Sequence, residues 1–338
     1  MPVDSPRNPL GVLFAAFNGF QRTAALKAAI DLDLFTAIGE GCSRPSELSQ
    51  RCGASERGLR MLCDSLVALA FLRKDGGRYA LEPELGMFLD RHSLAYLGSA
   101  ANFLASPMVM EAFGSLTAAV RQGGTAIRED AVLAPEHPVW VEFARSMASL
   151  AGLSARLLAN LLGAAAAAPW KVLDIAAGHG MFGIALAQEN PNARIVALDW
   201  ANVLAVAEEN ARVAGVADRF RTLPGSALAV DYGEGYDLVL LTNILHHFDV
   251  ETCEVLLRRV QAALAPGGRA VTLEFIPDEG RISPAEAATF ALVMLAMTPR
   301  GDAYTFSEYE RMFRRAGFVR SELRDLPPSI QRVVISYR

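Results

Sequence analysis

The sequence predicts an α/β protein, in which a parallel sheet with helices on both faces follows a mainly helical N-terminal part. Two observations carry this prediction. From residue 171 onward, strand-like and helical patterns alternate, and the first of these strands runs into a glycine turn at residues 172–183. The residues before 166 instead carry helical patterns with one short hairpin. A chain of 338 residues is long enough for two domains.

Composition narrows the class of protein. Apolar residues make up 52% of the chain and charged residues 20%, which supports a large core and excludes general disorder. No apolar run reaches the roughly 18 residues of a membrane span, and the N-terminus lacks the basic and apolar regions of a signal peptide. We therefore expect a soluble, cytoplasmic protein.

Charge and cysteine content predict no nucleic-acid, membrane or metal partner. The net charge of −5 gives no general attraction for nucleic acid or for a membrane surface. The four cysteines lie far apart in the sequence, without a Cys-x-x-Cys pair, so we expect buried thiols and no metal site.

Residues 1–95 are expected to form a winged-helix-like domain. Pro45 marks the start of one helix, and Ser55 caps a second helix whose leucines recur at helical spacing. Two short strands around Asp75-Gly76-Gly77 then form a hairpin. This order also suggests DNA binding, but the segment holds equal numbers of basic and acidic residues, whereas a DNA-reading module needs a basic face. We favour a domain that serves packing or dimerisation.

Residues 96–165 are expected to form a helical connector. Phe103 and Met147 lie among its Phe and Met residues on apolar helical faces. Phe290, Met294 and Met297 form a similar group later in the chain. Each such residue alone is typical of a hydrophobic core, but together they predict the wall of an apolar substrate pocket.

Residues 166–338 are expected to form the second domain. Its first four strands are predicted at residues 172–176, 194–198, 236–241 and 269–275. Its helices include residues 181–189, 203–213 and 251–264. A helix at 306–316 and strands at 321–325 and 330–337 close the chain. Such alternation is typical of a parallel sheet covered on both faces.

The glycine turn after the first of these strands predicts a ligand site. Gly178 and Gly180 allow a ligand to approach the backbone at the start of a helix, where free N–H groups are available. About 20 residues further on, Asp199 ends the second strand, where a carboxylate can accept both hydroxyls of a ribose. The motif therefore predicts a nucleoside-containing cofactor.

Two cofactors fit this motif. Gly178, Gly180 and Gly183 match the dinucleotide fingerprint, which keeps a nicotinamide-dependent oxidoreductase as an alternative. Asp174, however, lies just before the glycines, where an acid can receive an ammonium group but has no obvious role beside a pyrophosphate. This order favours S-adenosylmethionine, with Asp174 near its amino end and Asp199 on its ribose.

Four motifs together resemble the small-molecule O-methyltransferases, which include plant caffeate-type, animal acetylserotonin-type and bacterial polyketide enzymes. They are residues 172–180, residues 243–248, Pro266-Gly267-Gly268 and residues 314–318, and the resemblance covers nearly the whole chain. It implies a Rossmann-like class I methyltransferase domain with an antiparallel C-terminal strand. It also implies an N-terminal winged-helix dimerisation domain, hence a homodimer, and an aromatic small-molecule substrate.

The resemblance also assigns cofactor contacts. Trp200 would flank the adenine, and Ser226 would offer it a hydroxyl at a place where the family often has an acid and a methionine. The implied cofactor residues, together with Asp174, are Gly178, Gly180, Asp199, Trp200, Ser226, Ala227 and Asn243.

His246 is the predicted general base. It follows the strand at 236–241, at the sheet edge where α/β proteins bind ligands. Methyl transfer from a sulfonium needs the protein only to position the acceptor and to remove its proton. A phenol is protonated at pH 7, so a neutral imidazole suits this task. The resemblance places the base at His246, with His247 as its neighbour.

In the family two acids orient this histidine. The first matches Glu274, whereas the position of the second is Ala303, with Asp302 one residue away. We expect Glu274 to act with His246 and leave open whether Asp302 replaces the second acid. The incomplete set also leaves open a carbon or nitrogen acceptor.

The favoured function is S-adenosylmethionine-dependent methyl transfer to a hydroxyl of an aromatic small molecule. The alternatives are a non-catalytic ligand- or DNA-binding protein on the same scaffold and a nicotinamide-dependent oxidoreductase.

Overall fold

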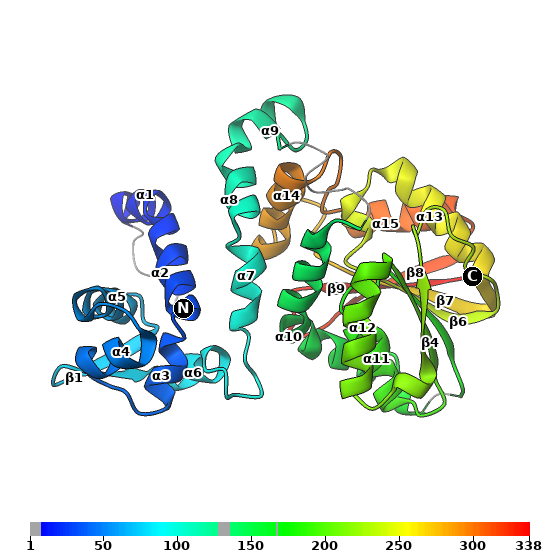
Figure 1. The fold of residues 1–338 in the computed structure, drawn as a ribbon. Coiled ribbons are helices and arrows are strands. Elements are labelled where there is room, and N and C mark those ends of the chain that lie inside the picture. Colours follow the sequence, from blue (N-terminus) through cyan, green and yellow to red (C-terminus); the bar gives the residue numbers. More distant parts are fainter. Residues whose placement is uncertain (1–7, 128–135, 167) are drawn as a thin grey trace. The chain divides into compact units, whose positions relative to one another are not determined.

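The computed structural model describes residues 8–127, 136–166 and 168–338, and the chain divides into two compact units, Met1–Ser106 and Pro107–Arg338 (Figure 1). This division falls after Ser106, so the segment expected as a helical connector, 96–165, contributes to both units. The three-part division at residues 95 and 165 stays a prediction. Residues 1–7, part of the argument against a signal peptide, lie outside the described residues.

The N-terminal unit has the predicted order of helix, helix and hairpin. Helix α4 begins at Pro45, because proline fits the first turn of a helix, and the hydroxyl of Ser55 accepts the N–H of Gly58 (3.1 Å) at the start of α5. Strands β1 and β2 pair antiparallel across the Gly76-Gly77 turn. The elements of this unit are α1 (Pro9–Phe17), α2 (Gly19–Asp31), α3 (Leu34–Gly39), α4 (Pro45–Cys52), α5 (Glu56–Ala68), β1 (Leu72–Asp75), β2 (Arg78–Leu81), α6 (Pro83–Leu89), η1 (Gly98–Ala100) and α7 (Ala101–Leu104).

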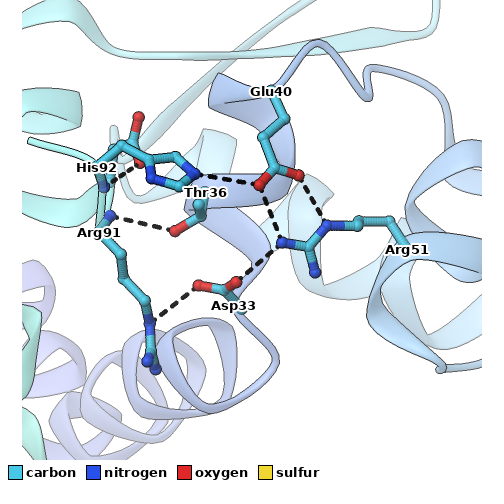
Figure 2. A network of polar contacts seen from close by, with 7 residues as sticks. Asp33, Thr36, Glu40, Arg51, Arg91 and His92 are labelled. Atoms are coloured by element: carbon cyan, nitrogen blue, oxygen red, sulfur yellow. Dashed lines mark hydrogen bonds and ion pairs between the residues drawn. The ribbon is translucent and has the colours of Figure 1, made fainter.

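A network of polar side chains joins α3 to α4 and to the stretch after α6 (Figure 2). Arg51 donates to Glu40 (2.7 and 3.1 Å) and to Asp33 (3.1 Å). Arg91 pairs with Asp33 at 3.0 Å, and His92 lies 3.2 Å from Glu40. The hydrogen bonds from Arg51 and His92 lower the pKa of Glu40 to about 2. Because water screens such exposed pairs, they order this surface more than they stabilise the fold.

The first two helices present large apolar side chains to solvent. No residue of α1 is buried. The exposed large apolar side chains of this stretch are Leu10, Val12, Leu13, Phe14, Phe17 and Phe20. Such a concentration on one short stretch is typical of an interaction surface.

The C-terminal unit begins with three helices and continues as the predicted alternation of strands and helices. Its elements are α8 (Pro107–Gly114), α9 (Leu116–Gln122), α10 (Pro138–Leu161), η3 (Ala164–Ala166), β3 (Lys171–Ile175), α11 (Met181–Glu189), β4 (Arg194–Asp199), α12 (Ala201–Val213), η4 (Ala217–Arg219), β5 (Phe220–Pro224), β6 (Tyr236–Thr242), η5 (Leu245–His247), α13 (Val250–Ala263), β7 (Leu264–Glu274), α14 (Ala285–Met297), α15 (Phe306–Arg315), β8 (Arg320–Asp325) and β9 (Arg332–Tyr337).

The described strands of this unit form one seven-stranded sheet in the order β5-β4-β3-β6-β7-β9-β8. Neighbouring strands are parallel from β5 to β7, and β9 runs antiparallel to both of its neighbours. The predicted mostly parallel sheet with an antiparallel C-terminal strand is confirmed. The chain moves outward from β3 to β5 and then returns to the other side of β3, so the order reverses between β3 and β6. In such sheets ligands bind at the carboxyl ends of the strands beside this point.

Strand β6 lies at the centre of the unit because both of its faces are apolar. Leu238 and Leu240 belong to the core beneath α10, α11 and α12, the helices drawn in green in Figure 1. Val239 and Leu241 belong to the opposite core, beneath α13 and α15. A continuous apolar run is typical of a strand that is covered on both sides.

Two strands differ from the expected boundaries. The sequence analysis did not predict β5, since this edge strand buries only Phe220 and so carries a weak apolar pattern. Strand β7 begins at Leu264 rather than at residue 269, because Leu264 already pairs with Tyr236 before a register shift. Neither difference moves the strand ends that carry the predicted site.

Within the described ranges, no helix combines the length and the apolar character needed to cross a membrane. The same residues contain no group of three or more His, Cys, Asp or Glu side chains that could hold a metal ion.

Candidate active site

The glycine loop follows β3 at the carboxyl edge of the sheet. Gly180 has a positive φ of 73° and directly precedes α11. A Cβ atom at this position would lie 2.9 Å from the Cβ of Ala207 on α12. Glycine is therefore required at position 180 both by the close approach of α12 and by the backbone conformation.

Two carboxylates flank this loop, that of Asp174, which is fully buried, and that of Asp199, which is half-buried. Asp199 accepts the N–H of Gly178 (2.8 Å) through Oδ2 and that of Trp200 (2.7 Å) through Oδ1. Asp174 accepts the N–H of Gly183 (3.1 Å) through Oδ2, but its buried Oδ1 has no hydrogen-bond partner among the described residues. A buried polar atom without a partner is costly, so this oxygen favours a ligand that donates to it, such as an ammonium group.

The electrostatics of the loop also favour a cation. Burial raises the pKa of Asp174 to about 7, the Asp199 carboxylate adds to this effect, and the N–H of Gly183 opposes it. Burial likewise raises the pKa of Asp199. A ligand with a positive charge near Asp174 would relieve both the desolvation and the repulsion.

The remaining predicted cofactor residues lie at the same sheet edge. Trp200 follows β4 and packs half-buried on a small core formed by α10 and α12. Ser226 and Ala227 follow β5, where the hydroxyl of Ser226 already accepts the N–H of Leu228 (3.2 Å). Asn243 follows β6 with a positive φ of 58°, and its side-chain oxygen accepts a hydrogen bond from Gln331. The fold gathers these residues at one edge, although the side chains of Ser226 and Asn243 already have partners.

His246 and Glu274 form a buried pair at the ends of β6 and β7. The ring Nδ1 of His246 contacts Oε2 of Glu274, and the two residues are 5% and 1% exposed. The other oxygen, Oε1, accepts the N–H groups of Ile244 (3.1 Å) and Leu245 (3.0 Å). Because a carboxylate can only accept, it selects the tautomer that carries hydrogen on Nδ1, and Nε2 is then available as a base.

His247 is a neutral neighbour of this pair. Its ring centroid lies 4.4 Å from that of His246, and its Nδ1 is buried without a hydrogen-bond partner among the described residues. Burial, aided by the proximity of His246, holds the pKa of His247 well below its usual value. His247 therefore stays uncharged at neutral pH.

The second acid of the family pattern has no counterpart at the ring. Ala303 is buried, and the carboxylate of Asp302 pairs with Arg281 (3.2 Å) and accepts the N–H of Ala303 (2.8 Å). The hydrogen bond from Asp302 to His246 comes instead from its backbone N–H, which donates to the carbonyl oxygen of His246 (3.0 Å).

Aromatic side chains surround the two histidines. Phe290 on α14 meets the ring of His246 edge-on, with centroids 4.9 Å apart, and stacks on Phe275 at 4.1 Å. Trp140 on α10 meets the ring of His247 at 5.9 Å. Phe275 and Trp140 were not among the predicted site residues. The position of Phe275 directly after Glu274 was a signal that could have identified it.

The other predicted pocket residues are more dispersed. Met294 and Met297 lie buried on the same helix as Phe290, and Met147 lies half-buried on α10. Phe103 belongs to the N-terminal unit, and its role in the pocket stays a prediction. A separate cavity of about 890 Å³ borders Gly301, and Asp302 is the one residue considered for the site that its lining includes.

The raised pKa of Asp174 predicts a pH-dependent stability. The folded protein keeps a proton on this carboxyl between about pH 4 and pH 7, whereas the unfolded chain loses it. The stabilising contribution of the protonated group is therefore complete below about pH 4 and is lost as the pH rises through 7, at up to about 1.4 kcal/mol per pH unit. Urea unfolding across this range should show the stability of the wild type falling relative to Asp174→Asn. A wild-type stability that stays constant or rises relative to that of Asp174→Asn as the pH increases would contradict this assignment.

Comparisons with known proteins identify the family of the chain. A family model described as the O-methyltransferase domain matches residues 131–319, and one described as the O-methyltransferase dimerisation domain matches residues 14–90. The crystal structure of a candidate O-methyltransferase from Nostoc punctiforme is 53% identical, covers 99% of this chain and 100% of its own, and has a TM-score of 0.92. The 3-hydroxy-5-methyl-1-naphthoate 3-O-methyltransferase of Streptomyces sahachiroi is 29% identical over 309 residues, which are 88% of this chain and 86% of that enzyme.

A more distant structure has the same fold. Human N-acetylserotonin methyltransferase, solved with S-adenosylmethionine, is 21% identical, covers 100% of this chain and 99% of its own, and has a TM-score of 0.86. The predicted family and fold class are thus confirmed. Since the first family model spans more than half of the sequence, the chain belongs to the O-methyltransferase family, whose enzymes use S-adenosylmethionine.

Proposed function

We propose that this protein transfers a methyl group from S-adenosylmethionine to a hydroxyl of an aromatic small molecule, with His246 as the general base. The observation that carries the proposal is the buried His246–Glu274 pair, on the sheet edge that also carries the glycine loop and its two acids. The names of relatives support the substrate class, because they include an acetylserotonin and a hydroxynaphthoate O-methyltransferase.

Asp174, Asp199 and the glycine loop would hold the cofactor. The free Oδ1 of Asp174 fits an ammonium group, and Asp199 lies at the end of β4, where a carboxylate can accept ribose hydroxyls. When bound, S-adenosylmethionine supplies an electrophilic methyl group. The need for a cation at Asp174 supports this cofactor over a nicotinamide dinucleotide, whose pyrophosphate carries negative charge.

His246 would remove the proton of the acceptor hydroxyl. Its Nδ1–H is held by Glu274, so Nε2 accepts the proton, and the buried carboxylate stabilises the imidazolium that forms. His247 stays neutral beside it, which avoids a second positive charge. Phe290 and Phe275 offer an aromatic acceptor a surface on which to stack next to His246.

Calorimetry tests the cofactor. We expect S-adenosylhomocysteine to bind and NADH not to bind. Asp199→Ala should weaken S-adenosylhomocysteine binding by about 10-fold or more, since hydrogen bonds to a charged acceptor are lost. Asp218→Asn, which changes an aspartate with a 75% exposed side chain, is the control. Binding of NADH alone would favour the dinucleotide alternative. If neither ligand binds, a non-catalytic protein is favoured.

Methyl transfer tests the base. With acetylserotonin and 3-hydroxy-5-methyl-1-naphthoate as acceptors, His246→Ala should lower kcat by about 10²-fold or more, while S-adenosylhomocysteine still binds. His92→Gln replaces a histidine whose side chain is 69% exposed in the N-terminal unit and should keep full turnover. An unchanged kcat in His246→Ala would show that another group removes the proton.

We also propose that the protein is a homodimer, formed through the exposed apolar side chains of α1 and α2. The match of the dimerisation-domain model to residues 14–90 and the exposure of Phe14 and Phe17 support this interface. Burying such side chains against a second copy would remove them from water, which favours association.

Sedimentation tests the dimer. The wild type should sediment at about twice the chain mass of 36.3 kDa at micromolar concentration. Replacing Phe14 and Phe17 together by glutamate should shift the protein to monomer, because charges would be buried in the interface. Leu94→Glu alters another exposed apolar residue and serves as the control. A wild type that sediments as a monomer would contradict the proposal.

A further inference from the structure

The segment between α14 and α15 crosses the main chain of His246 and His247, in the turn after β6, at very short range. A Cβ atom built on Gly301 would lie 2.2 Å from the carbonyl oxygen of His246 and 3.2 Å from the carbonyl carbon of His247. Both contacts are to backbone, so no side-chain rotation can relieve them. Only glycine therefore fits against His246 at this position.

Hydrogen bonds fix this segment on both sides of the contact. The N–H of Asp302 donates to the carbonyl oxygen of His246 (3.0 Å). The N–H of Gly301 donates to the hydroxyl of Thr298 (2.8 Å), which in turn donates to the carbonyl of Met294 on α14 (2.7 Å). The carbonyl of His246 is thus tied to a helix that also carries Phe290.

An arginine anchors the far side of the segment. Arg281 donates to the carboxylate of Asp302 (3.2 Å) and to the carbonyl of Ala303 (3.1 Å). Its other nitrogen donates to both oxygens of Glu308 (2.7 and 2.6 Å), and Glu308 accepts the N–H of Thr305 (2.8 Å) at the start of α15. The segment is therefore held at each end by a helix.

We infer that residues 298–303 form a backbone clamp on His246, with Gly301 as the positioning residue on which the clamp depends. The inference rests on the proposed function of His246 and extends it. Glu274 fixes the ring through Nδ1 and fixes the turn through two N–H groups, but it leaves the carbonyl side of His246 unrestrained. The clamp supplies that second restraint through main-chain atoms. The ring of His246, by contrast, contacts only one carboxylate among the described residues, that of Glu274.

Gly301→Ala tests the clamp, with Gly114→Ala as the matched control. A Cβ at Gly114 meets nothing within 4 Å, so the same chemical change there should be harmless. The first readout needs no acceptor: nuclear magnetic resonance of protein with ¹⁵N-labelled histidine, saturated with S-adenosylhomocysteine. The chain has five histidines, and His246→Gln identifies the signal of His246.

We expect the Nδ1–H of His246 to exchange slowly with water in the wild type and in Gly114→Ala. In Gly301→Ala it should exchange at least about 10-fold faster, as it should in Glu274→Gln, because the displaced carbonyl moves the ring away from its partner. With the two acceptors named above, kcat should fall by about 10²-fold while the Kd for S-adenosylhomocysteine changes little, since a displacement near 1 Å is costly only for the reaction.

A second variant covers the case in which Gly301→Ala does not fold. Arg281→Met removes the anchor without adding a clash and should give the same changes to a smaller degree, whereas Arg281→Lys should restore part of the protection. Slow exchange in every folded clamp variant would overturn the inference. If His246→Ala keeps full turnover, the proposed function fails. If His246→Ala is inactive but the clamp variants match Gly114→Ala, the clamp alone fails.

Discussion

The carboxylate of Glu274 holds together the turn after β6, residues 243–247, which carries His246. It joins the end of β7 to the turn after β6 by accepting the N–H groups of Ile244 and Leu245 and by contacting Nδ1 of His246. These bonds support one another. The two backbone bonds fix the main chain just before His246, and the contact with Nδ1 fixes the tautomer of its ring. A carboxylate that is 1% exposed needs all of these partners, since an unpaired buried charge would be strongly destabilising. The geometry of the loop and the tautomer of His246 thus depend on the same carboxylate.

The two carboxylates at the glycine loop differ from Glu274 because they have no side-chain hydrogen-bond partner among the described residues. Asp174 and Asp199 are held only by backbone N–H groups, and neither has a cationic partner in the part of the chain that the structure describes. Their raised pKa values express a cost that the folded protein bears without a ligand. A positively charged ligand that approaches Asp174 would remove this cost, whereas the Glu274 carboxylate already accepts from the His246 ring and from two backbone N–H groups. At the same edge of the sheet, Asp174 on β3 therefore favours a cation, and the ring of His246 after β6 presents a nitrogen that can accept a proton.

Much of this arrangement was predictable from the sequence, because strand ends are local features. The predicted strands at 172–176, 194–198 and 236–241 end beside the glycine loop, Asp199 and Asn243, which identifies the carboxyl edge of the sheet, and the residue types there indicate the chemistry. The clamp on His246 was not predictable in the same way. Gly301 follows His246 by more than 50 residues, and its need for glycine comes from a through-space contact with a carbonyl oxygen, which no local pattern encodes. The sequence also drew attention to the carboxylate of Asp302, whereas its backbone N–H makes the contact.

The register of the sheet brings the glycine loop and the turn that carries His246 close together. Strands β3 and β6 are parallel neighbours in which Ile175 pairs with Leu241, so their loops start at nearly the same height, one strand spacing of about 4.8 Å apart. Each loop then opens with a non-glycine residue in the left-handed region, Ala176 at φ 54° and Asn243 at φ 58°. Such residues cost about 1 kcal/mol or more each, and the surrounding structure must hold them in place. Here the buried pairing of β3 with β6 does so, and the two sharp turns direct one loop toward the acids of the cofactor site and the other toward Glu274. The backbone strain thus lies at the first residue after β3 and after β6, where the chain must turn sharply as it leaves the sheet.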